Sequence, residues 1–175
     1  MKLSEQWLRE WVEVAAPVNE ICKRLNLAGL EAEGAPLLET LPQNVRVGRI
    51  LSCENHPAAE RLQVCQVDVG EGTPRQIVCG APNARAGLLA PTALPGAVLP
   101  DGKSIGEATL RGVPSAGMLC SASELGLPDQ TDGLLELDAS AQPGQLLSAH
   151  LRLADQIITL ELTPNRGDCL SARGL

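Results

Sequence analysis

The sequence has 175 residues, 44% of them hydrophobic, which is enough to bury one good core, or one core and a smaller second one. It contains no run of about 18 apolar residues that could span a membrane. Its opening residues lack the apolar stretch of a secretory signal, so we expect a cytoplasmic protein. The net charge of −7 argues against a broadly basic surface for nucleic acid.

The charge is distributed unevenly along the chain. Residues 46–111 carry seven basic and six acidic side chains, whereas residues 112–149 carry five acidic side chains and no basic one. The middle of the chain is therefore the only stretch that can present a positive face, and that face is expected to be modest.

Six cysteines occur, but no two lie within ten residues of each other and there is no CxxC motif. This spacing favours neither a disulfide framework nor a zinc site. We therefore expect plain thiols that pack as small hydrophobic side chains.

The first predicted helix lies close to the N-terminus. Ser4 is placed to cap it, and Leu3 before the cap can pack onto Leu8. Trp7 and Trp11 repeat at helical spacing. We interpret the two tryptophans as part of this segment's own small core; the alternative is that they also dock against another protein surface.

The second predicted helix carries apolar residues from Val18 to Leu25 at helical spacing. Gly29 is well placed to end it in the left-handed conformation.

From residue 44 the pattern changes to short strands separated by turns. Apolar and polar residues alternate as they do in half-buried antiparallel strands. We predict strands at 45–51, 62–69, 75–79 and 88–93, a fifth, broken strand from 108–110 and 117–120, and a short closing strand at 133–137.

Five short strands with glycine kinks and little helix between them favour a small closed barrel, with a β-sandwich as the alternative. A further strand is predicted at 156–162, and Asp168 or Ser171 could cap a helix after it.

Catalytic motifs are scarce. The stretch Val113–Gly117 resembles a nucleophile elbow, but valine occupies the position where the tight turn requires the first glycine. His56 and His150 are the only histidines, and neither has an obvious orienting carboxylate. We predict no catalytic residue and no metal site in this chain.

Three motifs resemble the tRNA-binding OB domain shared by several aminoacyl-tRNA synthetases and free-standing tRNA-binding proteins. They are a His-Pro-x-Ala-Glu-Arg-Leu stretch at 56–62, Val-Asp-Val-Gly at 67–70, and Leu-Arg-Gly-Val-x-Ser-x-Gly-Met-Leu at 110–119. Thr109 stands where the last motif usually begins with a basic residue, so one expected positive charge is missing.

Other stretches narrow the resemblance to beta subunits of bacterial phenylalanine–tRNA ligases, over essentially the whole chain. They are residues 4–12, 28–31, 77–83, 120–126 and 162–171.

The resemblance implies an α+β fold, in which a five-stranded OB-fold barrel (41–149) is inserted into a small, incomplete α+β domain built from 1–40 and 150–175. It implies the N-terminal part of a subunit that binds tRNA(Phe). The parent enzyme would be an α2β2 assembly with an alpha subunit, and would charge that tRNA with phenylalanine using ATP and Mg²⁺. The aminoacylation and editing centres would lie outside this chain, which needs no cofactor of its own.

OB folds usually stack bases on aromatic side chains. This chain has no Phe and no Tyr, and both tryptophans lie outside the predicted barrel, so binding would rest on cation–phosphate contacts and hydrogen bonds. The candidate tRNA-binding residues are Arg61, Asn83, Arg85, Lys103, Arg111, Ser121 and Ser123.

Two other functions remain open. The acidic balance and the missing aromatics favour a structural docking module of the beta subunit with little tRNA contact. A free-standing tRNA-binding OB protein is the other alternative, although it would not carry the flanking motifs.

Overall fold

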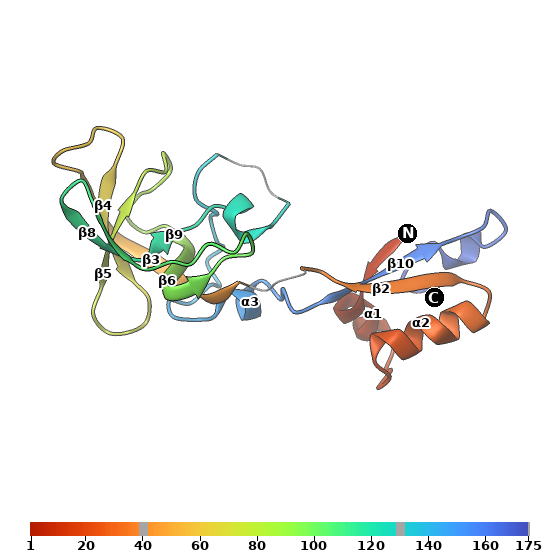
Figure 1. Cartoon of the computed structure of the whole chain (residues 1–175). Helices are drawn as coiled ribbons and strands as arrows, with labels where there is room; N and C mark the ends of the chain where they lie inside the picture. The colour runs from red at the N-terminus through yellow and green to blue at the C-terminus, as the bar shows by residue number, and fades with distance from the viewer. Residues whose placement is uncertain (39–41, 129–131, 175) are drawn as a thin grey trace. The chain divides into compact units, whose positions relative to one another are not determined.

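The computed structural model describes residues 1–38, 42–128 and 132–174. The chain divides into two compact units: a terminal unit, made of Met1–Glu39 and Leu153–Leu175, and a central unit, Thr40–Arg152. Strands predominate in the central unit, whereas the terminal unit combines three strands with two α-helices (Figure 1). No helix among the described residues is long and apolar enough to cross a membrane.

The terminal unit is a small antiparallel sheet with two helices packed on it. Its strand order is β1 (Lys2–Ser4), β10 (Gln156–Glu161) and β2 (Glu31–Pro36). Helices α1 (Glu5–Trp11) and α2 (Val18–Leu27) share a buried apolar cluster with this sheet. Because β10 is the middle strand, residues from both ends of the chain are needed to form the sheet.

Both helix ends follow the local signals in the sequence. Ser4 caps α1, because its Oγ accepts a hydrogen bond from the Trp7 N–H at 3.1 Å. Gly29 follows α2 with φ +82°, and the Leu30 N–H donates back to the Leu25 carbonyl at 2.9 Å. This is the Schellman arrangement, in which a left-handed residue closes the last turn.

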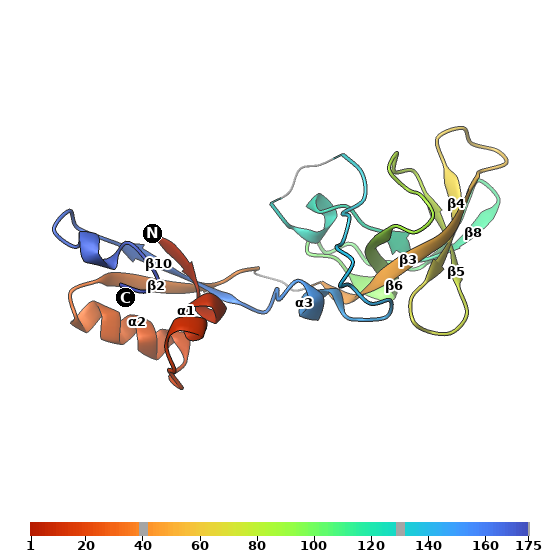
Figure 2. The same cartoon turned by 180° about the vertical axis from the view of Figure 1, so that it is seen from behind.

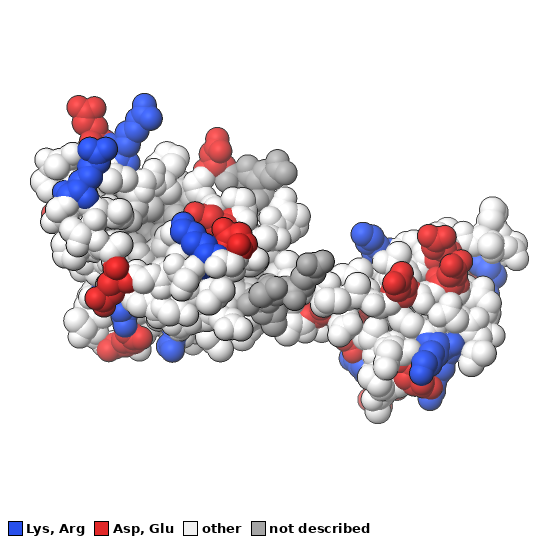
Figure 3. Space-filling view, viewed as in Figure 1, with Lys and Arg blue, Asp and Glu red and all other residues white. Residues whose placement is uncertain are grey.

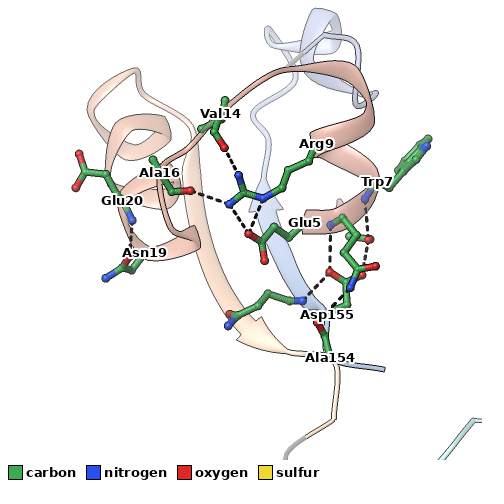
Figure 4. Close-up of polar contacts among 12 residues, drawn as sticks. Glu5, Trp7, Arg9, Val14, Ala16, Asn19, Glu20, Ala154 and Asp155 are labelled. Atoms are coloured by element: carbon green, nitrogen blue, oxygen red, sulfur yellow. Dashed lines mark hydrogen bonds and ion pairs between the residues drawn. The ribbon is translucent and has the colours of Figure 1, made fainter. Parts of the chain in front are cut away.

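Polar contacts hold the start of α1 in place (Figure 4). The Asp155 carboxylate accepts hydrogen bonds from the Ser4 hydroxyl and the Gln6 N–H. Arg9 pairs with Glu5 one turn earlier and donates to the carbonyl of Ala16. These contacts connect α1 to the strand that arrives from the C-terminal segment and to the loop that follows the helix.

The tryptophans do not fill the core of the terminal unit. Leu8 is buried, but Trp7 is 47% exposed and Trp11 57% exposed. The interpretation that they belong to the unit's own core is therefore wrong. A seven-residue helix buries only a narrow stripe, and Leu8 occupies it.

The helix expected to begin at Asp168 or Ser171 is also absent from the described residues. A 3₁₀ turn, η2 (Gly167–Cys169), takes its place. The Asp168 carboxylate pairs with the Arg166 guanidinium at 3.2 Å instead of capping a helix.

The central unit contains a curled five-stranded antiparallel sheet (Figures 1 and 2). The strands follow the order β5-β4-β3-β6-β9. Their bounds are β3 (Gln43–Asn55), β4 (Gln63–Asp68), β5 (Arg75–Cys79), β6 (Leu89–Val98) and β9 (Met118–Leu119). The register of β3 shifts in two places, once against β4 and once against β6, and such bulges increase strand twist. Apolar side chains such as Ile50, Val67, Ile77 and Leu119 are buried together in this unit.

The region predicted as one broken strand forms two structures. Strands β7 (Glu107–Leu110) and β8 (Val113–Ala116) make a separate two-stranded hairpin, and β9 joins the main sheet beside β6. The hairpin turns at Arg111 and Gly112, with φ +47° and +89°. Positive φ at both central residues is the requirement of a two-residue hairpin turn of type I′.

The closing strand expected at 133–137 does not form. Single backbone bonds from Leu135 to Cys120 (3.2 Å) and from Leu137 to Leu89 (2.9 Å) hold this segment without a regular ladder. A 3₁₀ turn, η1 (Ser123–Leu125), precedes the segment, and the short helix α3 (Leu147–His150) follows it.

All six cysteines are free thiols, and five of them are buried, as expected. Cys53 is partly exposed and faces Cys65 across β3 and β4, with the two Sγ atoms 3.1 Å apart.

Candidate functional site: a cationic rim around an apolar cavity

A cavity of about 650 Å³ opens in the central unit. Its walls come from the end of β5, the β7–β8 hairpin, β9 and the loops that flank them. Most of the larger side chains lining it are apolar, among them Leu62, Ile105, Leu110, Met118 and Leu134, and two are charged, Lys103 and Glu124.

His56 connects two of the segments around this cavity through hydrogen bonds of its ring. Its Nδ1 accepts a hydrogen bond from the Ala58 N–H at 3.0 Å, so its Nε2 carries the proton and donates to the Leu110 carbonyl at 3.0 Å. The ring is 5% exposed. The histidine therefore shapes its own turn and also holds the loop before β4 against the tip of the hairpin.

Two arginines lie where this loop and the hairpin meet. Arg61 directly precedes the wall residue Leu62, and Arg111 directly follows Leu110. Both side chains are exposed, and no carboxylate of a described residue lies within ion-pairing distance of either. Figure 3 shows basic side chains, with an acidic one beside them, over the end of the central unit where strands β4 and β8 begin.

Lys103 contributes a third positive charge to the cavity. A turn positions it, because its backbone N–H donates to Asp101 Oδ1 at 2.9 Å. Its Nζ lies 3.7 Å from the sulfur of Met118, which also lines the cavity. The ammonium group therefore lies next to an apolar wall.

Arg85 is already paired. Its guanidinium donates to both carboxylate oxygens of Glu136 at 2.7 Å. The hydrogen bond from Arg85 is the main reason that the pKa of Glu136 falls to about 2. Asn83 bonds both the N–H and the carbonyl of Leu134, at 2.8 and 2.9 Å, and thereby holds one wall of the cavity.

Ser121, Ser123 and Glu124 form a polar cluster at another edge of the cavity. Glu124 Oε2 accepts hydrogen bonds from the Ser121 N–H at 2.8 Å and from its hydroxyl at 2.9 Å, while the Glu124 N–H donates to Ser121 Oγ at 3.4 Å. This reciprocal pattern is a capping box around η1. The hydroxyl of Ser123 lies 3.0 Å from that of Ser121.

A protein-family model described as "Putative tRNA binding domain" matches residues 45–146. The chain belongs to this tRNA-binding domain family.

Over its whole length the chain is also similar to phenylalanine–tRNA ligase beta subunits. It is 52% identical to those of Methylococcus capsulatus and Nitrosococcus oceani and 49% identical to that of Coxiella burnetii. In each comparison the whole of this chain covers 22% of the relative. The chain thus spans about a fifth of the length of the curated relatives it matches. The resemblance predicted from the motifs is confirmed.

A solved structure, the C-terminal domain of Plasmodium vivax p43, superposes with a TM-score of 0.43 and 23% identity over 58% of this chain and 56% of that one. This similarity is too low to support a conclusion.

Two of the seven predicted site residues line the cavity, and the others lie next to lining residues or bond to residues near it. Lys103 and Ser121 line it, and Arg61 and Arg111 adjoin residues that line it. Asn83 contributes indirectly, because it bonds to the lining residue Leu134, and Ser123 lies within hydrogen-bonding distance of the lining residue Ser121. Arg85 forms an ion pair with Glu136.

Three residues that contribute to the cavity were not predicted from the sequence. His56 hydrogen-bonds to the hairpin, Met118 lines the cavity, and Glu124 lines it with a carboxylate that Ser121 positions. The motifs contained all three. The motifs do not reveal that β7 pairs with β8, and this hairpin is what brings Leu110 within hydrogen-bonding distance of His56.

Proposed function

We propose that this chain is the tRNA-binding and structural N-terminal region of a phenylalanine–tRNA ligase beta subunit, and that it helps the enzyme charge tRNA(Phe) with phenylalanine. The observation that carries the proposal is a cavity of a tRNA-binding domain that Lys103 lines, together with Leu62 and Leu110, the chain neighbours of Arg61 and Arg111. We name these three cations the rim. Phosphates of RNA are the natural partners of such cations.

The fold proposed for this role is an OB-fold barrel, residues 41–149, inserted into an α+β domain formed by 1–40 and 150–175. The curled five-stranded sheet supports the barrel. A terminal unit whose middle strand comes from the C-terminal segment supports the insertion.

The strength of binding should be modest. Three phosphate contacts predict a slope of log K against log salt of roughly −2 to −3. The isolated chain should bind tRNA with a Kd of about 10⁻⁴ to 10⁻⁶ M, the range of sequence-independent binding. Arg85 should add little, because Glu136 already occupies its guanidinium.

The test is a titration of the chain with tRNA(Phe) at two salt concentrations, for example by fluorescence anisotropy of labelled tRNA. The variants Arg61→Ala, Lys103→Ala and Arg111→Ala should each weaken binding and reduce the salt slope by about one unit.

Arg24→Ala is the matched control, because Arg24 is exposed in the terminal unit and its ion pair is with Glu20, one turn away. An absence of binding at low salt, or rim variants that behave like the control, would rule out tRNA contact through this face.

The parent assembly supplies the rest of the function in this proposal. The chain would work with the remainder of the beta subunit and with an alpha subunit in an α2β2 enzyme that uses ATP and Mg²⁺. Catalysis would take place outside this chain.

A second candidate, the docking role, is favoured by the exposed tryptophans of α1. Figure 4 shows the Trp7 ring directed away from the polar contacts around it, and Trp11 borders an apolar cavity of about 360 Å³ in the terminal unit. In this role the two rings would pack against another part of the beta subunit.

Replacing Trp7 and Trp11 by serine separates the two roles. The double variant should bind tRNA as the unaltered chain does, while a full-length beta subunit that carries it should lose stability in thermal unfolding. Unchanged stability of that full-length variant would eliminate docking through the tryptophans.

A further inference from the structure

The cavity in the central unit has apolar walls although its rim is cationic. Leu62, Leu110 and Met118 line it beside Lys103. Phosphate groups bound at the rim gain nothing from such walls. The apolar walls therefore indicate a ligand that has an apolar part as well as a negative charge. The cavity's volume of about 650 Å³ lies within the usual range of ligand pockets.

The carboxylate of Glu124 adds a second requirement. It lines the cavity, and both hydrogen bonds from Ser121 go to Oε2. No described residue donates to Oε1. Glu124 is half-buried, so this oxygen can accept a hydrogen bond from a donor on a ligand in the cavity.

We propose that this cavity receives one unstacked nucleobase of single-stranded RNA, a base that carries an exocyclic amino group, with its flanking phosphates at Arg61, Lys103 and Arg111. The inference rests on the proposed tRNA binding. The base lies against Met118 and the two leucines, and its amino group donates to Glu124 Oε1. Cytosine, adenine and guanine carry such a group. Uracil does not, and its single N–H lies between two carbonyl oxygens that a carboxylate repels.

This arrangement explains how a nucleic-acid-binding domain can work without aromatic side chains. The chain has no Phe and no Tyr, and Trp7 and Trp11 belong to the terminal unit. Aliphatic and thioether surfaces supply the contact that aromatic rings supply elsewhere.

The chain offers a direct reporter, because it has only two methionines. Met118 lines the cavity and Met1 belongs to the terminal unit. In a methyl NMR spectrum of the chain labelled at both methionines, oligo(rC) should move the Met118 signal upfield and leave Met1 unchanged. The central unit contains no aromatic ring other than imidazole, so the upfield shift would come from the base.

Two variants on neighbouring positions of β7 test the cavity itself. Ala108 lines it, whereas Thr109 does not, and both are exposed. Ala108→Phe should fill the cavity, weaken oligo(rC) binding about fivefold to tenfold and abolish the Met118 shift. Thr109→Phe adds the same ring outside the cavity and should change neither.

The choice of base is tested with oligo(rU) and with an oligo(rC) that carries an abasic site. Both should bind more weakly than oligo(rC), and Glu124→Gln should reduce the difference between C and U. Equal affinity for all three oligonucleotides, or a Met118 signal that does not move, would overturn the proposal.

These outcomes are separable from a failure of tRNA binding. If Ala108→Phe keeps full tRNA affinity while Arg111→Ala loses it, the rim binds RNA and the base pocket is wrong. If neither oligonucleotide nor tRNA binds at low salt, the proposed function fails as well.

Discussion

The His56 side chain helps to position two charged residues, Arg61 and Arg111, although its own ring is neutral. Its buried ring makes a bond to Leu110 and accepts a bond from Ala58, and both bonds are partly buried. Arg61 and Arg111 lie on the two segments that the bond from His56 to Leu110 joins. The position of the cationic rim therefore depends on a neutral imidazole.

His56→Ala should lower the free energy of unfolding by about 1–3 kcal/mol, because a buried ring and two partly buried hydrogen bonds are lost. The measurement is urea denaturation followed by circular dichroism. The variant should also weaken tRNA binding by releasing the loop that carries Arg61.

A double-mutant cycle distinguishes positioning from a general loss of structure. In an Arg61→Ala background, His56→Ala should cost less binding than it does alone, because its effect acts partly through Arg61. Strict additivity would contradict a positioning role.

The ion pair between Glu136 and Arg85 predicts a pH dependence. The pKa of Glu136 is about 2 in the folded chain, below its ordinary value of 4.5. A depressed pKa means that the pair stabilises the fold above about pH 4.5 and that this contribution is lost as the pH falls towards 2. Stability measured between pH 5 and 2 should therefore fall more steeply for the unaltered chain than for Glu136→Gln. Parallel curves would show that the pair does not contribute.

Among the elements, the β7–β8 hairpin depends most on its turn. Arg111 and Gly112 both have positive φ, a conformation that only glycine adopts without strain. Gly112→Ala should destabilise the central unit by about 1–2 kcal/mol in thermal or urea unfolding.

Gly106→Ala is the control for this change, since Gly106 precedes β7, has no positive φ and has open space where the added methyl group would lie. It should be neutral or slightly stabilising. A similar loss in both variants would show that the turn conformation is not the cause.

The elements that local chemistry determines could be predicted from the sequence, and those that depend on distant partners could not. Ser4 and Gly29 were identifiable because a cap involves only a few neighbouring residues. The hairpin was missed because a proline such as Pro114 usually interrupts a strand, whereas here it lies within β8, whose partner β7 makes no other strand pairing.

Exposure was harder to predict than helix formation. Trp7, Leu8 and Trp11 share helical spacing, but only the packing of α1 on its sheet decides that Leu8 alone is buried. For the site, residue types and approximate segments were predictable. The cavity was not, because five separate segments form it.

At the scale of the whole molecule, the two units have separate cores. Residues 40–152 expressed alone should therefore unfold cooperatively, as measured by far-ultraviolet circular dichroism during heating. Removal of residues 153–175 should abolish the terminal unit, because β10 lies between β1 and β2.

Tryptophan fluorescence reads this second outcome separately. Both tryptophans belong to the terminal unit, so the truncated chain should lose its tryptophan unfolding transition and keep a transition in circular dichroism. A tryptophan transition that persists after the truncation would contradict the requirement for β10.

The central position of β10 also sets an order of events on the ribosome. Strands β1 and β2 leave the exit tunnel long before residues 156–161 exist, a delay of about 6–24 s at bacterial translation speeds. During that interval the first 38 residues have no middle strand to pair with, whereas the last residue of the central unit is synthesised before β10. The nascent chain should therefore complete its inserted part first and close its two ends around β10 last.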